Sequence, residues 1–151
     1  MDDLTDIIIK YRGGIAGTLI MAFVVAYLAS RNNRLNRLAI ASTTFRNTIL
    51  TELKGLYPIP TEWPKDISML DQRLRQAFPN LQTIVTNFRP FVPWYRRRAF
   101  DKAWFIYRLG KDGREIDEQL YHQYMSFSDN PNYKEHFKRN VDKLLSYAKQ
   151  K

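Results

Sequence analysis

The sequence predicts an all-α protein with one N-terminal transmembrane helix followed by a bundle of about five or six helices. Three observations lead to this prediction. Residues 13–30, GGIAGTLIMAFVVAYLAS, contain no charged side chain. After Arg31, apolar residues recur every three or four positions, which is the period of an amphipathic helix. No segment alternates between polar and apolar residues for long enough to predict a strand.

The uncharged run 13–30 has the length and the flanks of a membrane span. At ~1.5 Å per residue, a helix over these positions covers about 27 Å, close to the thickness of the hydrocarbon core of a bilayer. Tyr11 and Tyr27 lie near its ends, where aromatic rings favour the membrane interface. A cleavable signal fits less well because three aspartates lie in the leading segment, which is positively charged in a signal, and no clean cleavage site follows. A buried core helix rarely stays uncharged on every face for this length.

The basic residues that flank the run predict its orientation. Arg31, Arg34 and Arg37 follow it, whereas Lys10 and Arg12 precede it. Positive residues collect on the cytoplasmic side, so we expect the N-terminus outside and the C-terminal domain in the cytoplasm.

These features divide the chain into four segments. We predict a short N-terminal segment over 1–12, the transmembrane helix over 13–30, a juxtamembrane amphipathic helix over 31–54 and a basic helical bundle over 55–151.

Small residues repeat on one face of the predicted span. Such faces let two helices approach closely in lipid, where packing drives association, so we expect a homo-oligomer. Glycine and alanine are common in any span, which leaves chance as the other explanation. The residues of this face are Gly13, Gly14, Gly17, Thr18, Ala22 and Ala26.

The first helix after the span is predicted over 34–54, continuous with the span. Leu38, Ala41, Phe45, Ile49 and Leu53 form its apolar stripe. Gly55 and the proline-rich segment YPIPTEWP end it.

Proline and a capping residue mark the next three helices. Asp66 can cap a helix that ends at Pro79, Asn80 can start another that ends before Pro90, and Pro93 suits the first turn of a helix that runs to about Arg108. The apolar stripe of that last helix comprises Phe100, Ala103, Trp104 and Tyr107.

The C-terminal part contains two more predicted helices. KDG at 111–113 indicates a turn, and a helix follows over 114–125. SDNPN at 128–132 indicates a loop before a helix over 132–149, whose cations are expected on its outer face. The apolar stripe of this last helix comprises Phe137, Val141, Leu144, Leu145 and Ala148.

The charge of the chain, +9 overall, lies in the part after the span. Such a basic domain suits an anionic neighbour, which could be a lipid headgroup, nucleic acid or an acidic protein. The chain has no cysteine, so disulfides, thiolate zinc sites and thiol nucleophiles are excluded. It also lacks the G-x-S-x-G and phosphate-loop motifs. We therefore expect no catalytic activity and no cofactor.

The most distinctive segment of the bundle is FRPFVPWYRRRAF, over 88–100, in which Trp94 and Tyr95 precede Arg96, Arg97 and Arg98. Three interpretations compete. The rings and arginines could lie in an anionic headgroup layer, together with the three arginines after the span. They could instead stack on bases and hold phosphates. In the third interpretation, Trp94 is buried in the bundle.

The histidines give little indication of chemistry. Glu115, Glu118 and His122 would share one helix face, but no second helix offers a matching pair of ligands, so no metal site is expected. Arg114 and His122 are spaced more widely than the Arg and His of HEPN ribonucleases, and they are only a secondary candidate for a catalytic pair. The layout, a single span and a small helical domain, is similar to that of proteins that accompany prokaryotic defence systems.

Taken together, the sequence predicts a single-pass membrane protein that acts as a non-enzymatic scaffold or adaptor. Its expected partners are membrane lipid, a second copy of itself and a protein at the membrane. The alternatives are an oligomeric pore and a membrane-tethered effector that binds nucleic acid or cleaves RNA, such as an accessory protein of a defence system.

Overall fold

The computed structural model describes residues 2–111, 113, 120–125 and 132–149, and the side chains within these ranges at position 18 and from position 20 onward. All regular secondary structure in these ranges is helical, which confirms the predicted all-α class. The chain divides into two compact units, unit 1 over Met1–Ala39 and unit 2 over Ile40–Lys151.

Unit 1 consists of the first part of helix α1 (Asp2–Glu52), which continues without a break into unit 2. The predicted continuity of the helix through residues 13–52 is therefore confirmed. Within the described residues, no helix is long and apolar enough to cross a membrane. Part of the predicted span, residues 13–17 and 19, has side chains outside the described set.

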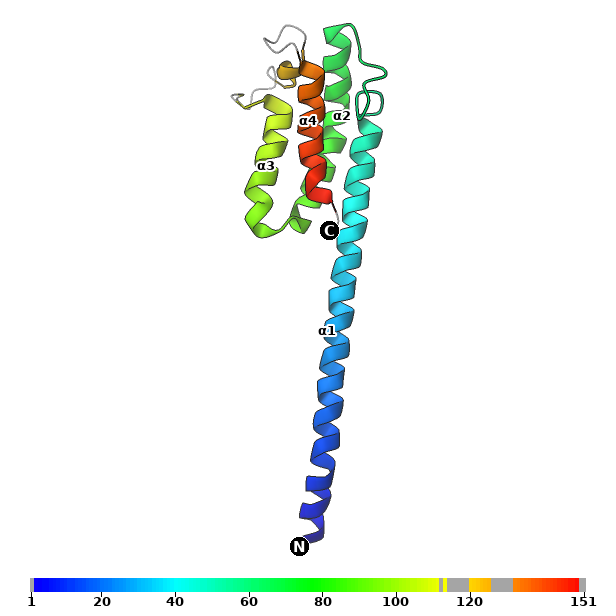
Figure 1. Ribbon diagram of the computed structural model, residues 1–151, viewed down its shortest axis with the longest axis vertical. Coiled ribbons are helices and arrows are strands. Elements are labelled where there is room, and N and C mark those ends of the chain that lie inside the picture. The colour runs from blue at the N-terminus through cyan, green and yellow to red at the C-terminus, as the bar shows by residue number, and fades with distance from the viewer. Residues whose placement is uncertain (1, 112, 114–119, 126–131, 150–151) are drawn as a thin grey trace. The chain divides into compact units, whose positions relative to one another are not determined.

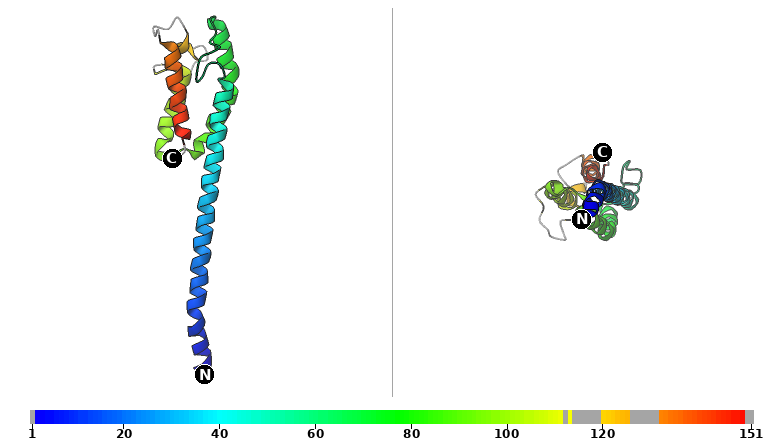
Figure 2. Two further views of the ribbon diagram at one scale, coloured as in Figure 1. Left: turned by 45° about the vertical axis from the view of Figure 1, so that its right-hand side comes forward. Right: turned by 90° about the horizontal axis from the view of Figure 1, so that it is seen from below.

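Unit 2 is a bundle of four antiparallel helices in up-down-up-down order (Figures 1 and 2). They are the end of α1 from Ile40 onward, α2 (Ile67–Phe88), α3 (Trp94–Leu109) and α4 (Tyr133–Leu145). The chain enters unit 2, passes from α2 to α3, and finishes α4 at the same end of the bundle (Figure 1). We call this end, defined by Ile40, Trp94 and Ser146–Ala148, the Trp94 end.

The core of unit 2 is rich in aromatic residues. Near the Trp94 end, the Phe45 ring stacks on Phe88 with centroids 4.4 Å apart, and both rings contact Phe100. These three side chains come from α1, α2 and α3, and each is fully buried. They therefore join three of the four helices at a single point.

The predicted apolar stripes of unit 2 pack into or against this core. The predicted stripe residues of α3, of α4 and of the 3₁₀ turn over Ser146–Ala148 are all buried, as are Phe45, Ile49 and Leu53 of α1. Leu38 and Ala41 are half-buried. The predicted cap is also confirmed, since the Asp66 side chain accepts a hydrogen bond from Ser68 N–H at 2.9 Å.

The prediction that Pro79 ends a helix was wrong. Helix α2 continues through Pro79 to Phe88, so the two helices predicted on either side of this residue are one. The apolar residues of α2 keep a single helical register across Pro79, and their burial outweighs the ~3 kcal/mol cost of an internal proline. These buried residues are Leu70, Leu74, Ala77, Leu81, Val85 and Phe88.

The prediction of a helix over 114–125 was also wrong over the described residues 120–125. Tyr121 has a left-handed backbone conformation, with φ of 64°, and a single 3₁₀ turn over His122–Tyr124 follows it. Residues 114–119 lie outside the described set. Over the described residues the chain thus has four α-helices instead of five or six.

The aromatic junction predicts a large effect of one core substitution. Phe45→Ala should lower the free energy of unfolding of unit 2 by about 3–5 kcal/mol because it opens a cavity where three helices meet. Denaturant unfolding of the full chain in detergent micelles, followed by tryptophan fluorescence, measures this change. Met69→Ala, at a side chain of α2 that is 62% exposed, is the control and should change the value by less than about 0.5 kcal/mol. Equal effects of the two substitutions would contradict the junction.

Candidate functional site

The exposed aromatic pair at the start of α3 is the first candidate surface. The connection from α2 to α3 is short, with a 3₁₀ turn over Arg89–Phe91 and a buried Val92. Pro93 then caps α3, and Trp94 and Tyr95 occupy the first helical turn. Their side chains are 80% and 69% exposed, with the rings edge to face at 6.0 Å. The interpretation that buries Trp94 in the bundle was therefore wrong.

The three arginines after this pair have different environments. Arg97 donates hydrogen bonds to the backbone carbonyls of Val92 and Pro90, at 3.1 and 3.0 Å, so it holds the connection between α2 and α3 in place. The Arg96 guanidinium lies 4.8 Å from the centroid of the Tyr147 ring. Arg96 and Arg98 are both exposed. Only these two can offer their charge to a ligand without breaking the connection.

A bidentate ion pair braces the same corner. The Arg89 guanidinium donates to both carboxylate oxygens of Asp101 at 2.8 Å, which links the end of α2 to the middle of α3. This contact raises the pKa of Arg89 through the hydrogen bond and the charge of Asp101. It also neutralises a carboxylate that lies near the Trp94 end.

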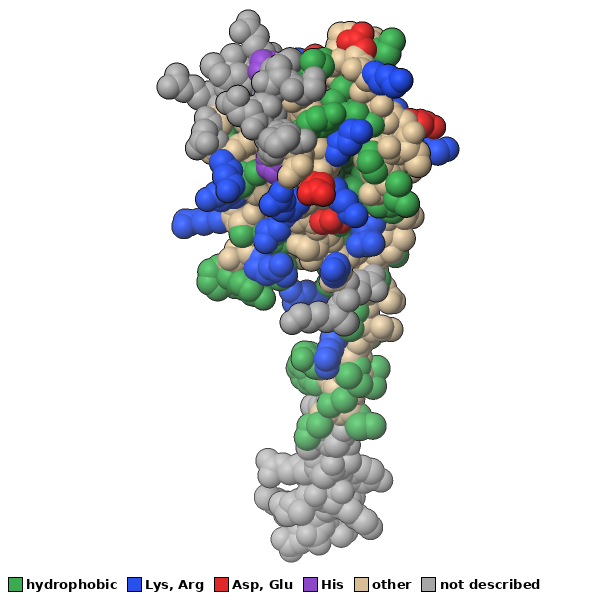
Figure 3. All heavy atoms as spheres, turned by 45° about the horizontal axis from the view of Figure 1, so that its top comes forward, with side chains coloured by type: hydrophobic (Ala, Val, Ile, Leu, Met, Phe, Trp, Pro, Cys, Tyr) green, Lys and Arg blue, Asp and Glu red, His purple; other side chains and the backbone are tan. Residues whose placement is uncertain are grey.

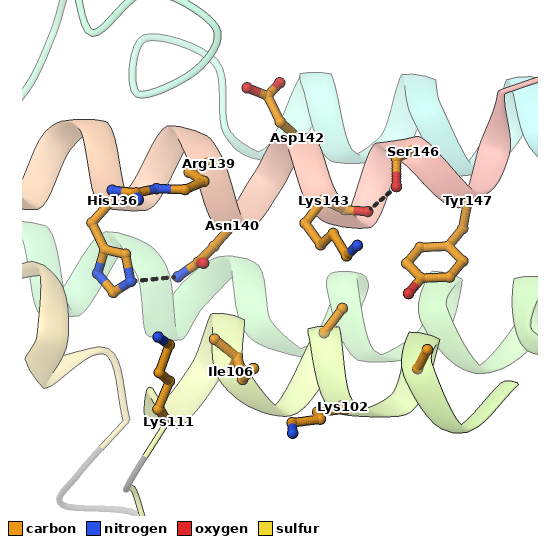
Figure 4. Close-up of a pocket in the computed structure, with 12 residues that line it drawn as sticks. Lys102, Ile106, Lys111, His136, Arg139, Asn140, Asp142, Lys143, Ser146 and Tyr147 are labelled. Atoms are coloured by element: carbon orange, nitrogen blue, oxygen red, sulfur yellow. Dashed lines mark hydrogen bonds between the residues drawn. The ribbon is translucent and has the colours of Figure 1, made fainter. Parts of the chain in front are cut away.

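The second candidate surface is a groove between α3 and α4, with a volume of about 670 Å³ (Figure 4). On the α3 side, Ala99 and Ala103 are too short to fill the space between the helices. On the α4 side, His136, Asn140 and Lys143 follow one another at helical spacing along the groove. The groove thus exists because short apolar side chains face a row of longer polar ones.

The rim of this groove is strongly basic. Lys102, Lys111, Arg139 and Lys143 line it, and none of them forms an ion pair within the part of the chain that the structure describes. Figure 3 shows lysine and arginine side chains gathered on a face of the bundle. The one carboxylate of the groove lining belongs to Asp142.

Asp142 is occupied by a contact on another side of α4. The Tyr57 hydroxyl donates to Asp142 Oδ1 at 2.5 Å, and Figure 4 shows this carboxylate turned away from the groove. Burial, followed by the hydrogen bond to Asp142, raises the pKa of Tyr57 to about 12.

A small polar network forms one end of the groove. Asn140 Nδ2 donates to the Tyr124 hydroxyl at 2.9 Å, and this hydroxyl donates to the Tyr107 carbonyl at 2.8 Å. His136 Nε2 lies 3.5 Å from Asn140 Nδ2. His136 Nδ1 is buried and has no hydrogen-bond partner among the described residues. Burial, and then the positive charges of Arg139 and Lys111, lower the pKa of His136.

The residues predicted to carry function are found in several places. Arg31, Arg34 and Arg37, and the span residues Thr18, Ala22 and Ala26, have exposed side chains in unit 1. The surroundings of Gly13, Gly14 and Gly17 lie outside the described set, as do Arg114, Glu115 and Glu118. His122 is exposed in its 3₁₀ turn. Among the residues that are described, no three metal-ligating side chains come together.

The groove was missed at the sequence level. The cations of α4 were expected on an outer face, yet Arg139 and Lys143 line the groove, where His136 and Asn140 join them. The small side chains of α3 are visible in the sequence, but their significance depends on which helix lies opposite them. No local signal identifies α4 as that helix.

Comparisons with protein families, curated proteins and solved structures find no match to this chain. The two surfaces themselves therefore indicate the function.

The environment of His136 predicts a low pKa that NMR can measure. We expect the His136 ring to titrate below 6.5, and Lys111→Gln to raise its pKa by removing one of the two charges. Because the unfolded chain takes up this proton first, the free energy of unfolding should fall as the pH drops below about 6.5, until the folded state is protonated too. Lys138→Gln, a charge change elsewhere on α4, is the control and should leave the titration unchanged. A His136 pKa at or above 6.5 would contradict this assignment.

Proposed function

We propose that this chain is a single-span membrane protein without catalytic activity, and that its basic bundle acts as an adaptor docked on anionic lipid through the Trp94 end. The observation that carries the docking is the exposure of Trp94 and Tyr95, at 80% and 69%, beside the exposed Arg96 and Arg98. Unit 2 leaves two adjacent large rings uncovered although it buries most of its other aromatic side chains.

The membrane anchor is supported by the charge-free run 13–30 and by the exposure of the apolar side chains in its described part. Seven large apolar side chains in this part are between 46% and 76% exposed, so the chain itself does not cover them. An apolar surface of this kind needs a cover, and the hydrocarbon of a bilayer supplies it. These residues are Ile20, Met21, Phe23, Val24, Val25, Tyr27 and Leu28.

The tether supports docking by the Trp94 end in particular. The chain enters unit 2 at Ile40, at the same end of the bundle as Trp94 (Figure 1). The helical residues between Ser30 and Ile40 rise by only about 15 Å. A span over 13–30 would therefore hold this end within reach of the headgroups, at a high local concentration.

The side chains of the Trp94 end match the chemistry of a headgroup layer. Trp94 and Tyr95 have rings with one polar atom each, which suits the boundary between hydrocarbon and water. Each arginine near an anionic surface contributes about 1 kcal/mol. With the N-terminus outside, the bundle would meet the cytoplasmic leaflet, which is the anionic one.

An adaptor of this kind would also associate with itself through the small-residue face of the span. Gly13, Gly17 and the alanines after them allow close helix packing in lipid. A second copy of the chain and a protein at the membrane are accordingly its expected protein partners. The same rings and arginines could instead bind single-stranded RNA, and the docking experiment separates the two ligands.

Fluorescence quenching in nanodiscs tests the docking. With the full chain in nanodiscs that contain brominated phosphatidylglycerol, bromine should quench the Trp94 emission, so Trp94→Phe should remove more than half of the quenching. Trp63→Phe is the matched control because Trp63 packs against Tyr133 and Phe137 inside unit 2. Arg96→Gln with Arg98→Gln should reduce the quenching at least twofold, and added salt should do the same.

The docking proposal fails if Trp94→Phe and Trp63→Phe lose the same share of the quenching. It also fails if neutral phosphatidylcholine quenches as well as the anionic lipid does. Loss of quenching on addition of oligouridine, with binding that depends on Arg96 and Arg98, would favour the RNA alternative.

Alkaline carbonate extraction tests the anchor separately. The full chain should remain in the membrane pellet, whereas Met21→Arg should release a measurable fraction because an arginine at the centre of a span costs about 2.5–3.5 kcal/mol. Asn32→Arg, which lies outside the run 13–30, is the control and should stay in the pellet. Release of the unchanged chain by carbonate would overturn the anchor.

A further inference from the structure

The groove between α3 and α4 is a second surface with a chemistry of its own, and it meets the Trp94 end at Ser146 and Tyr147. We propose that it binds a phosphate ester that carries an apolar or aromatic group, either a nucleoside phosphate or the headgroup of a phospholipid. This ligand would be additional to the lipid on which the bundle docks.

The charges of the groove favour an anionic ligand. Lys102 and Lys111 from the α3 side face Arg139 and Lys143 from α4, and no described carboxylate pairs with any of the four. Asp142, the acidic residue of the lining, is engaged by Tyr57 and turned away (Figure 4). A site whose charged groups are almost all donors, with its one carboxylate used elsewhere, suits a ligand with several acceptor oxygens.

The arrangement at one end of the groove fits a phosphate. Figure 4 shows the Lys111 amine directed toward the His136 and Asn140 pair, with Arg139 on the same helix as that pair. Lysine is a compact point charge with three donors, and arginine is a planar fork, so together they suit a tetrahedral oxyanion. Burial lowers the pKa of His136, and the positive charges of Arg139 and Lys111 beside it lower the pKa further.

The rest of the groove accounts for the apolar part of the ligand. Ala99, Ala103 and Ile106 form one wall, and the Tyr147 ring lies toward the Trp94 end. The volume of about 670 Å³ is in the usual range for small-molecule sites and much larger than an inorganic phosphate needs. A base or the glycerol and first acyl carbons of a lipid would occupy this space.

Binding measurements on the full chain in maltoside micelles, which carry no phosphate, test the proposal. The probes are adenosine diphosphate, dihexanoyl phosphatidylglycerol and pyrophosphate, added separately in a calorimetric titration. We expect saturable binding, one ligand per chain, of one of the first two, and weaker binding of pyrophosphate because it lacks the apolar part. Whichever of the first two probes binds more tightly shows whether the ligand is a nucleoside phosphate or a phospholipid headgroup.

Two variants locate the site. Arg139→Gln with Lys143→Gln should lower the affinity for the preferred probe more than tenfold. Ala99 is exposed, so the larger side chain of Ala99→Leu fills the groove without entering the core. This variant should lower the affinity for the preferred probe several-fold and leave the affinity for pyrophosphate unchanged. Lys138→Gln with Lys149→Gln removes the same charge from exposed positions that do not line the groove, and it should leave all three affinities unchanged.

The proposal is overturned if neither adenosine diphosphate nor dihexanoyl phosphatidylglycerol binds, or if the control pair weakens binding as much as the groove pair does. It is also overturned if Ala99→Leu reduces pyrophosphate and the larger probes equally, since the apolar wall would then have no role. These outcomes are distinct from a failure of membrane docking, because every groove variant retains Trp94, Arg96 and Arg98.

Discussion

The contact of Phe45 with Phe88 and Phe100 is the interaction on which the rest of unit 2 depends. It joins α1, α2 and α3 near the end of the bundle where the chain enters, and all three rings are fully buried. Because Phe45 follows Ile40 by little more than one helical turn, this junction fixes where α1 joins the bundle. Because Phe88 and Phe100 flank the connection from α2 to α3, it also fixes the position from which Trp94 and Tyr95 are displayed. The core thus determines the surface at this end.

The groove is also a consequence of how the helices of unit 2 pack. Helix α4 uses one side for the core, through Phe137, Val141 and Leu144, so its remaining sides must be polar. One of these polar sides faces α3, where Ala99 and Ala103 leave space. A longer apolar residue at either position would have closed the gap against α4. The resulting site gathers cations that repel one another, and this repulsion is an electrostatic cost to the folded chain that an anion would relieve.

Local chemistry could be predicted from the sequence, and long-range pairing could not. The cap at Asp66, the break at Gly55 and the stripe ending at Ala148 depend on neighbours along the chain, and the structure confirms them. The prediction at Pro79 was wrong because the burial of apolar residues on both sides of it outweighs the local cost of an internal proline. The exposure of Trp94 and the groove depend on which helices lie together, and no local pattern contains that information. The sequence therefore singled out Trp94 and its neighbouring arginines without predicting their exposure, and it gave no indication of the groove.

The two surfaces share one contact, and this determines how they can be separated. The Arg96 guanidinium of the Trp94 end lies over the ring of Tyr147, which lines the groove. A lipid phosphate that draws Arg96 away from this ring would change the wall of the groove, and by linkage a groove ligand that holds Tyr147 would change the affinity of Arg96 for lipid. Arg98 is exposed, and neither a hydrogen bond nor a ring contact ties it to Tyr147 within the described part of the chain. A substitution of Arg98 therefore tests membrane docking alone, whereas a substitution of Arg96 affects both membrane docking and the groove.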